Sequence, residues 1–154
     1  DYLYDFFSEL YGIPTDRRDA RKCMLFARFG IQEFAQVRVR DLSTGMKQKV
    51  SLVISLVQDP EIIIFDEPTN GLDILTAKVV TDFLLDLKEQ GKTIIISTHI
   101  FSLVEKICDR VGIIINGRMA ACEDLRTLCG DKSLEDRFFE IYEAVNGEDE
   151  NHDK

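Results

Sequence analysis

Two uncharged, β-branched runs separated by a helix-length segment restrict this chain most strongly to one fold class. Ile62 to Phe65 and Thr93 to Ser97 form these runs, and neither alternates regularly between polar and apolar residues. Such runs are typical of strands that are buried on both faces of a parallel sheet. The stretch between them, from Leu75 to Gln90, repeats apolar residues at helical spacing. A strand, a helix and a second strand in this order predict an α/β fold.

Helices are predicted for the residues before the first apolar run. The first helix spans Asp1 to Tyr11 and stops at Gly12, and the second is capped by Asp16 and closed by Gly30. Helical spacing predicts the buried faces of these two helices, which are Tyr2, Phe6 and Leu10 in the first and Met24, Leu25 and Phe29 in the second.

A third helix is predicted to begin at Ser43, after a loop over residues 32–42, and to end near Gln58. Serine is a favourable N-cap because its side-chain oxygen accepts a hydrogen bond from the first turn. The apolar residues that recur at helical spacing in this helix are Met46, Val50, Val53, Ile54 and Val57.

The residues after the second run predict a hairpin between helices. The Asn116-Gly117 pair favours a type I′ turn between Val111 to Ile115 and Arg118 to Ala121. Ser133 and Asp136 resemble a capping box at the start of the last helix. The helices themselves are expected near residues 102–109, 123–128 and 133–145.

The composition is that of a soluble globular protein, and it argues against a nucleic-acid surface, a zinc site and a membrane span. A formal net charge of -9 argues weakly against a surface for nucleic acid. Four widely spaced cysteines and two histidines show no zinc-ligand spacing, so reduced thiols are expected. The longest apolar run, Val50 to Val57, is far shorter than the ~20 residues that a membrane span needs.

The segment from Leu42 to Lys49 predicts an anion site at the start of the third helix. Ser43 offers a hydroxyl donor, Gly45 permits close approach of the backbone, and the nearby lysines add positive charge. The N–H groups and the dipole of a helix both favour an anion at its N-terminus. Taken alone, this segment also suits an ordinary capped amphipathic helix.

Two adjacent carboxylates, Asp66 and Glu67, follow the first run directly and precede Pro68. The carboxyl ends of strands are where open α/β sheets bind their ligands. Asp66 is suited to holding Mg²⁺ through water. Glu67 is suited to orienting or deprotonating an attacking water, a role that contributes about 10²–10⁴-fold in rate. A solvated strand end before a proline turn is the alternative.

Two shorter motifs complete the set. The turn Asn70-Gly71-Leu72-Asp73 is ordinary when taken alone, and a single histidine at a strand end, here His99, often has only a structural role. Parallel strands joined by a helix share their carboxyl side, so His99 is expected at the same sheet edge as Glu67. That placement favours contact with the terminal phosphate of a nucleotide.

In this order and spacing, the four motifs resemble those of the ATP-binding-cassette (ABC) ATPases. Leu42 to Gln48 is similar to the family signature, and Ile62 to Glu67 is similar to the Walker B strand with its catalytic glutamate. Gly71-Leu72-Asp73 resembles the D-loop, and His99 resembles the switch histidine. The resemblance covers nearly the whole chain.

The signature points to one group within this family. Thr44-Gly45-Met46 replaces the commoner Gly-Gly-Gln, and a methionine followed by Lys-Gln-Lys looks like the ATPases that pair with ABC-2 type exporter subunits, the sodium- and drug-exporter-like group. Residues 133–138 are also similar to the C-terminal helix of that group. Ile74 departs from the proline that the family often has at this position.

The resemblance implies two such domains, most simply a homodimer, that close head to tail over two ATP molecules. It also implies a transmembrane permease subunit that contacts residues 1–58, and hence a cytoplasmic protein, peripheral at the inner face of the cell membrane and without a nucleic-acid partner. The implied residues are Ser43, Thr44, Gly45, Met46 and Asp73 for ATP across the dimer, Asp66 for Mg²⁺ through water, and Glu67 and His99 for catalysis.

Neither a Walker A loop, G-x-x-x-x-G-K-[ST], nor the glutamine loop of this family occurs in the 154 residues. The family fold places the missing Walker A strand between residues 93–97 and 111–115, so we expect a partial P-loop NTPase core with exposed strand edges. Because the chain begins with Asp1 rather than Met, we expect a C-terminal part of a longer protein. Because the Walker A loop and its strand are missing, we expect that this part by itself is inactive and does not stay soluble as a monomer. The expected parts are a helical subdomain (1–58), an α/β core (59–122), C-terminal helices (123–146) and a disordered tail (147–154).

Two other functions fit the same motifs. A soluble ABC ATPase of translation or DNA repair is one, although such proteins usually carry tandem cassettes or an insertion, and the acidic balance here does not favour them. A truncated, non-catalytic partner that lends Ser43 and Gly45 to another subunit's ATP is the other. The coding sequence upstream of Asp1 separates a fragment from the truncated partner, because a Walker A loop there makes this chain a fragment, whereas an immediate start codon favours the truncated partner.

Overall fold

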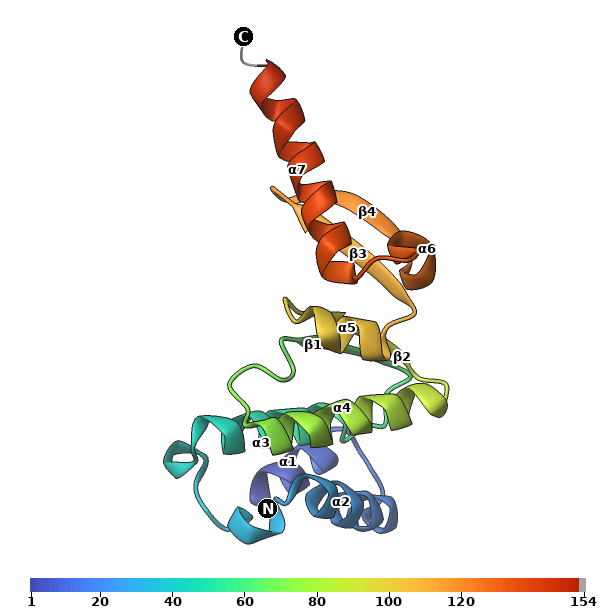
Figure 1. Cartoon of the computed structure of the whole chain (residues 1–154). Helices are drawn as coiled ribbons and strands as arrows, with labels where there is room; N and C mark the ends of the chain where they lie inside the picture. Colours follow the sequence, from blue (N-terminus) through green and yellow to red (C-terminus); the bar gives the residue numbers. More distant parts are fainter. Residues whose placement is uncertain (153–154) are drawn as a thin grey trace. The chain divides into compact units, whose positions relative to one another are not determined.

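The structure, a computed structural model, describes residues 1–152, with side chains through residue 147. Its contacts divide the chain into two units, Asp1–Ser97 and Thr98–Lys154 (Figure 1). The first unit contains the predicted helical segment and both apolar strands, and the second contains the predicted hairpin. The boundaries predicted at residues 58 and 122 stay predictions.

The first unit has the predicted strand–helix–strand order. Strands β1 (Ile62–Asp66) and β2 (Thr93–Ser97) pair in parallel, with Ile64 opposite Ile95, and helix α4 (Ile74–Glu89) connects them. The elements before β1 are α1 (Tyr2–Leu10), α2 (Thr15–Phe29), two short 3₁₀ helices (Gln32–Phe34 and Val39–Asp41) and α3 (Thr44–Ser55). The α/β prediction is therefore confirmed.

Helix α1 forms where predicted but buries a different face. Tyr4 and Ser8 are buried, and Tyr4 meets Phe26 of α2 edge to face, with ring centroids 5.6 Å apart. The face predicted to be buried is instead exposed in this unit, namely Tyr2, Phe6 and Leu10. Helical spacing identifies residues that share a face, but packing against α2 selects which face is buried.

Helix α2 differs from the prediction at its start and on its buried face. Pro14 occupies the N-cap position, and Asp16 lies in the first turn instead of capping the helix. Met24 is exposed, whereas Phe26 takes a buried place beside Leu25 and Phe29. The end is as predicted, because Gly30 adopts the left-handed conformation with φ 64°. Helix α3 ends at Ser55, three residues before the predicted end.

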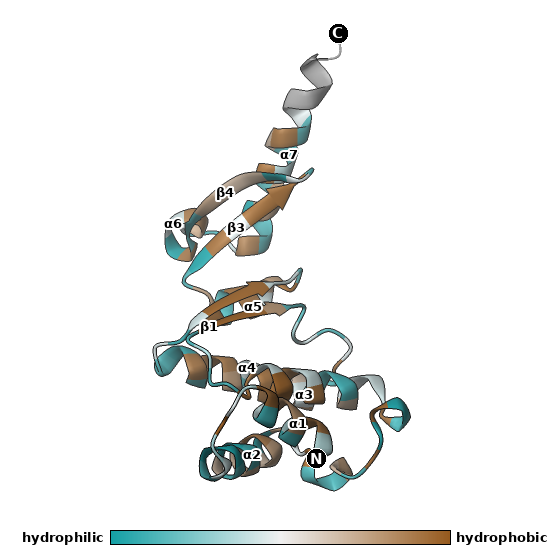
Figure 2. Cartoon of the chain, turned by 180° about the vertical axis from the view of Figure 1, so that it is seen from behind, coloured by the Kyte–Doolittle hydropathy of each residue, from teal (hydrophilic) through white to brown (hydrophobic). Residues whose placement is uncertain are grey.

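Strand β1 is buried on one face only, which corrects the prediction of two buried faces. Ile63 and Phe65 are buried, whereas Ile64 is 73% exposed and Ile62 is also exposed. Figure 2 shows β1 as a strongly apolar strand. Side chains of a strand alternate between the faces of a sheet, and the packing of the first unit covers just one of them. The exposed isoleucines belong to the other face.

The second unit is a hairpin covered by helices. Its elements are α5 (Phe101–Ile107), β3 (Arg110–Ile115), β4 (Arg118–Asp124), α6 (Leu125–Cys129) and α7 (Leu134–His152). The type I′ prediction is confirmed, because Asn116 and Gly117 both have positive φ, at 50° and 74°. The core of this unit gathers residues from β3, α6 and the start of α7, which are Ile113, Ile115, Leu128 and Leu134.

The last helix begins at the predicted cap and runs beyond the predicted end. Ser133 Oγ accepts a hydrogen bond from the Asp136 backbone N–H at 3.1 Å and donates one to its carboxylate at 2.6 Å. The helical backbone continues to His152, into the segment predicted as a disordered tail. Residues 153–154 of that tail lie outside the described residues.

Candidate functional site

The start of α3 has the geometry predicted for the signature segment. Ser43 adopts extended backbone, and its Oγ accepts a hydrogen bond from the Met46 N–H at 3.2 Å. Ser43 and Thr44 are exposed, whereas Gly45 and Met46 are half-buried. The first N–H groups of an α-helix have no acceptor within the helix. This helix end can therefore present a hydroxyl group and backbone N–H groups to an anion.

The signature segment lies beside the turn that precedes α4. A Cβ added to Gly45 would lie 3.8 Å from Leu72 Cδ2, and one added to Gly71 would lie 3.9 Å from Thr44 Cγ2. Both distances are ordinary van der Waals contacts. Gly71 has φ 72°, a conformation that glycine adopts without strain. The structure thus brings together two motifs that the sequence separates by more than 20 residues.

At the carboxyl end of the parallel strands, Asp66 meets Ser97. The two residues are direct partners in the strand register, and the Ser97 hydroxyl donates a hydrogen bond to Asp66 Oδ1. Both are exposed. Mg²⁺ prefers such hard oxygen donors and usually takes only one or two carboxylates together with water and phosphate oxygens. The pair therefore fits that ion, and no larger His, Cys, Asp and Glu cluster occurs among the described residues.

Ser97 is a candidate site residue to which the sequence analysis assigned no role. Its signal was nevertheless present, because it is the polar last residue of a strand that pairs in parallel with the strand ending at Asp66. Choosing it required the register between the two strands, which the composition of each run leaves open.

Glu67 begins a tight turn directly after β1. Its φ is 46°, which is uncommon for a residue with a side chain. Its N–H donates to the Ser97 carbonyl at 2.9 Å, and its carbonyl accepts from the Asn70 N–H at 3.1 Å. Backbone held in a sparsely populated region is frequent at functional sites. The turn keeps this carboxylate, which is half-buried, at the carboxyl edge of the sheet.

Asp73 has a structural role that the sequence analysis missed. It is the N-cap of α4, where its carboxylate accepts the Thr76 N–H at 3.0 Å and the Thr76 hydroxyl at 2.7 Å. These hydrogen bonds, the hydroxyl first, hold the pKa of Asp73 below its ordinary value. An Asp followed three residues later by Thr at a helix start was the available signal. The predicted role across a dimer stays a prediction.

His99 belongs to the second unit. It is exposed and lies between β2 and α5, next to Thr98, whose Oγ1 accepts a hydrogen bond from the Ile100 N–H at 3.2 Å. The predicted convergence of His99 with Glu67, which belongs to the first unit, stays a prediction.

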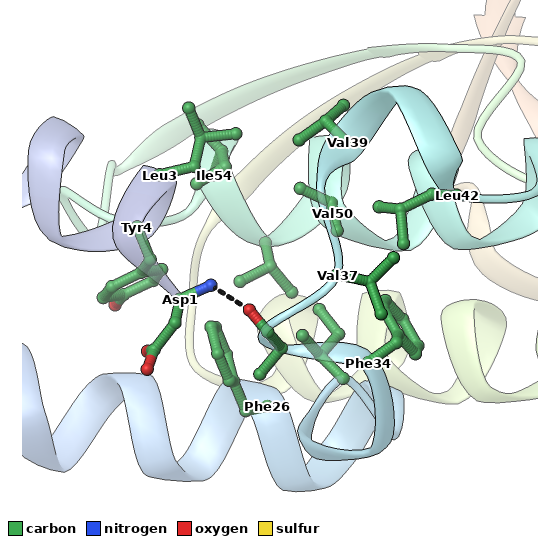
Figure 3. Close-up of a pocket in the computed structure, with 13 residues that line it drawn as sticks. Asp1, Leu3, Tyr4, Phe26, Phe34, Val37, Val39, Leu42, Val50 and Ile54 are labelled. Atoms are coloured by element: carbon green, nitrogen blue, oxygen red, sulfur yellow. Dashed lines mark hydrogen bonds between the residues drawn. The ribbon is translucent and has the colours of Figure 1, made fainter.

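The helical part of the first unit contains a separate hollow of about 40 Å³ (Figure 3). Its lining is mostly apolar and includes Leu3, Phe34, Val50 and Ile54. On one side the backbone nitrogen of Asp1 donates to the Ala35 carbonyl at 2.7 Å. An apolar lining of this kind suits a hydrocarbon side chain and offers little to phosphate.

No helix within residues 1–152 combines the length and the apolar character that crossing a membrane requires.

Comparison with known proteins agrees with the geometry of the first unit. The profile of the family described as ABC transporter matches residues 6–70. The ABC transporter ATP-binding protein NatA of Bacillus subtilis is 39% identical over 131 residues, which are 85% of this chain and 53% of NatA. The chain is a relative of the ABC transporter ATP-binding proteins. A fluoroquinolones export ATP-binding protein of Mycobacterium tuberculosis is 36% identical over 118 residues, 77% of this chain and 38% of that protein.

Solved structures of such ATP-binding proteins share the fold. An ATP-binding subunit of an ABC transporter matches with a TM-score of 0.85 and 28% identity, over 91% of this chain and 60% of that one. A dimeric ATP-binding cassette in a post-hydrolysis state, bound to ADP and Pi, matches with a TM-score of 0.65 and 26% identity, over 75% and 50%. The chain spans about half the length of the curated ABC relatives that it matches. The predicted family and fold class are confirmed.

Proposed function

We propose that the complete protein is the ATP-hydrolysing subunit of an ABC exporter and drives transport through a membrane subunit. The observation that carries this proposal is the carboxyl edge of β1 and β2, where Asp66 is bonded to Ser97 and Glu67 is held in a left-handed turn. The relative named for fluoroquinolones export supports export as the direction.

Each predicted site residue has a distinct task in the proposal. The oxygens of Asp66 and Ser97 would hold Mg²⁺, partly through water, and the ion when bound neutralises charge on the phosphates. Glu67 would orient the attacking water and accept its proton. His99 would contact the γ-phosphate. The Walker A loop that grips the β- and γ-phosphates would come from a part of the protein outside this sequence.

In the proposed mechanism, two copies close head to tail and complete each other's sites. Ser43, Thr44, Gly45 and Met46 of one copy would bind the terminal phosphate of the ATP held by the other copy, and Asp73 would connect the two sites. The exposed and capped start of α3 supports this arrangement, because its donors face away from the helix. The dimeric relative that holds ADP and Pi also supports it.

The proposed contact with the permease lies on residues 1–58, and it would keep the protein at the inner face of the membrane. The exposed aromatic rings of Tyr2 and Phe6 on α1 support this, as does the apolar hollow beside Leu3. Exposed apolar side chains of this kind favour a protein partner. Co-purification of the full-length protein with its membrane subunit tests the contact, and Tyr2→Ser combined with Phe6→Ser should weaken it.

The hydrolytic role is tested by Glu67→Gln in the full-length protein. ATP binding should persist, because the amide keeps the shape of the side chain, whereas turnover should fall about 10²–10⁴-fold. Glu89→Gln at the exposed end of α4 is the matched control and should leave turnover unchanged. Turnover at the wild-type rate in the Glu67 variant would remove this residue from catalysis.

A further inference from the structure

The far end of α3, opposite the signature segment, is held by an arginine from another helix. Arg21 of α2 donates its Nε–H to the Leu56 carbonyl at 2.8 Å and its Nη2 to Asp59 Oδ1 at 2.9 Å. Leu56 is the C-cap of α3, and Asp59 lies in the turn that leads to β1. One guanidinium group therefore binds both the last carbonyl of the helix and the turn that follows it, a geometry that lysine cannot reproduce.

The same turn is also held by a lysine that directly precedes β2. Lys92, next to the start of β2, places its Nζ 3.3 Å from both the carbonyl and Oδ1 of Asp59, and 3.0 Å from Glu61 Oε1. The Lys92 side chain is only 9% exposed. Asp59 itself has φ 52°, which a residue with a side chain adopts at a cost. Two cations thus stabilise an unfavourable turn.

Helix α2, which carries Arg21, is in turn anchored to α4. The rings of Phe29 and Phe83 meet edge to face with centroids 5.1 Å apart, and Arg28 forms an ion pair with Asp86 at 2.6 Å. Arg21 is therefore part of a rigid path from α4, through α2, to the C-terminal end of α3.

Small rotations at this held end become large displacements at the start of α3. The helix has 12 residues, so it is about 18 Å long. A tilt of about 5° about its C-terminal end would move Ser43 and Gly45 by about 1.6 Å. A misplacement of about 1 Å at reacting groups can cost about 10²-fold in rate.

We propose that Arg21 is a positioning residue that acts on the ATP of the other copy. It holds the C-terminal end of α3 against Asp59 and so places the signature segment, Ser43 to Met46, at the phosphate in the partner copy's site. This rests on the proposed head-to-tail dimer. Loss of Arg21 impairs the site to which its chain lends the signature segment and spares the site to which the same chain lends Glu67.

Mixed dimers of the full-length protein test this directly. Each copy carries a different affinity tag, and Glu67→Gln silences one site, so turnover comes from the other site alone. Arg21→Gln is then placed either in the same chain as Glu67→Gln or in the opposite chain. In the first arrangement the active site receives its signature segment from the Arg21 variant, and we expect turnover about 10–100-fold below the second arrangement. In the second arrangement turnover matches that of the dimer with Glu67→Gln alone.

The two arrangements contain the same substitutions, so a general loss of stability affects both equally. Equal turnover in the two would overturn the proposal. Arg17→Gln, which removes an exposed charge from the same helix, is the matched control and should show no difference between arrangements. If the dimer with Glu67→Gln in one copy has no turnover, or if the doubly substituted Glu67→Gln dimer keeps it, the proposed function itself fails and Arg21 loses its role with it.

A second measurement does not require turnover. Arg21→Lys keeps the charge but cannot bind Leu56 and Asp59 with the same fork of donors. Amide hydrogen exchange should rise in residues 53–59 of this variant while the exchange of β2 stays unchanged. Unchanged exchange in residues 53–59 would show that Arg21 does not hold the end of α3.

Discussion

The N-terminal end of α3 carries uncharged residues, Ser43 to Met46, that are exposed or half-buried, whereas its C-terminal end and the turn that follows it are held by the charged side chains of Arg21 and Lys92. At the first end, Ser43 makes one hydrogen bond to Met46 within its own turn. At the second, Arg21 binds the Leu56 carbonyl and Asp59, and Lys92 also binds Asp59. One helix thus has an end that can receive a ligand and an end that is fixed to the protein.

This difference shows how a protein can present backbone donors accurately without covering them. Donors that serve a bound phosphate have to stay accessible, so contacts that fix their position have to be made elsewhere. A helix transmits position along its length because its backbone hydrogen bonds make it stiff. Substitutions at the first end should therefore affect activity more than stability, and those at the second should affect both.

Within helix α3, the largest expected effect is the loss of turnover in Gly45→Ala. A Cβ at this position lies 3.8 Å from Leu72 Cδ2 within the chain, so the variant should fold, and its melting temperature should equal or exceed that of the wild type. Turnover of the full-length protein should fall about 10²-fold, because the methyl group blocks the approach of backbone to phosphate.

The matched control for Gly45→Ala is Gly147→Ala, which is also helical and has open space around its Cβ position. This control should leave turnover unchanged. A melting temperature that drops in Gly45→Ala would show that the loss arises from packing against Leu72 rather than from the phosphate site.

A smaller effect is expected when the cap of α3 is removed. Ser43→Ala loses the bond to the Met46 N–H, which should lower the free energy of unfolding by about 1 kcal/mol. It also removes the hydroxyl donor and should reduce turnover by about tenfold, as expected for one hydrogen bond to a charged group. Ser43→Thr keeps the hydroxyl, and equal losses in both variants would contradict this role.

At the other end of α3, Asp59→Asn should weaken the protein modestly and in a salt-dependent way. Asparagine tolerates the left-handed turn at φ 52° but removes the charge that attracts Arg21 and Lys92. Partly exposed ion pairs contribute up to about 1 kcal/mol, so urea unfolding should show a loss of about 0.5–1 kcal/mol.

That loss should shrink when NaCl is raised to about 1 M, because salt screens exposed charges. Asp41→Asn, which removes one member of the exposed pair between Arg40 and Asp41, is the control and should change the free energy of unfolding very little. A deficit of Asp59→Asn that does not respond to salt would mean that the turn depends on hydrogen-bond geometry rather than on charge.

The smallest expected effect is the pH-dependent part of the stabilisation that Asp73 gives as the charged N-cap of α4. The Thr76 hydroxyl and N–H lower the pKa of Asp73 in the folded protein, so its ionised form stabilises the fold at pH values above its unfolded pKa of about 3.9. This stabilisation is lost as the pH falls through the lower folded pKa. Asp73→Ala should therefore melt below the wild type at pH 7, and the difference should shrink below about pH 4.

The deficit of Ser43→Ala should stay constant over the same pH range, because serine does not titrate. Melting temperatures measured between pH 3 and 7 compare the two caps directly. A difference for Asp73→Ala that stays the same at low pH would show that its hydrogen bonds to Thr76 do not depend on ionisation.

Much of the local structure could be predicted because it depends on residues close together in the chain. Ser43 caps a helix as predicted, Gly30 ends one, and Asn116-Gly117 turns a hairpin. The buried faces of α1 and α2 were predicted wrongly, because Tyr4 and Phe26 are buried rather than Tyr2 and Met24. Choosing between faces of a helix needs the position of its neighbours, which no periodicity contains.

The candidate site divides in the same manner. The order of motifs was sufficient to identify the family. The chemistry predicted for Asp66 and Glu67 follows from their residue types and from their place at a strand end that the sequence marks clearly, and it stays a prediction. Ser97 was missed because its bond to Asp66 depends on strand register. The capping role of Asp73 was not predicted, because the resemblance to the D-loop implies a role for this residue at the dimer interface and none in the helix that follows.

The sequence by itself determines the order of helices, strands, turns and motifs in this protein, because propensity, capping and turn chemistry act over a few residues. Only the tertiary structure shows that Arg21 donates a hydrogen bond to the Leu56 carbonyl, 35 residues away, and that Gly45 lies against Leu72. Contacts between distant residues follow from how the helices pack onto the sheet, and many packings satisfy the same local pattern. The place that the signature segment, Ser43 to Met46, takes in space therefore depends on how the whole first unit packs.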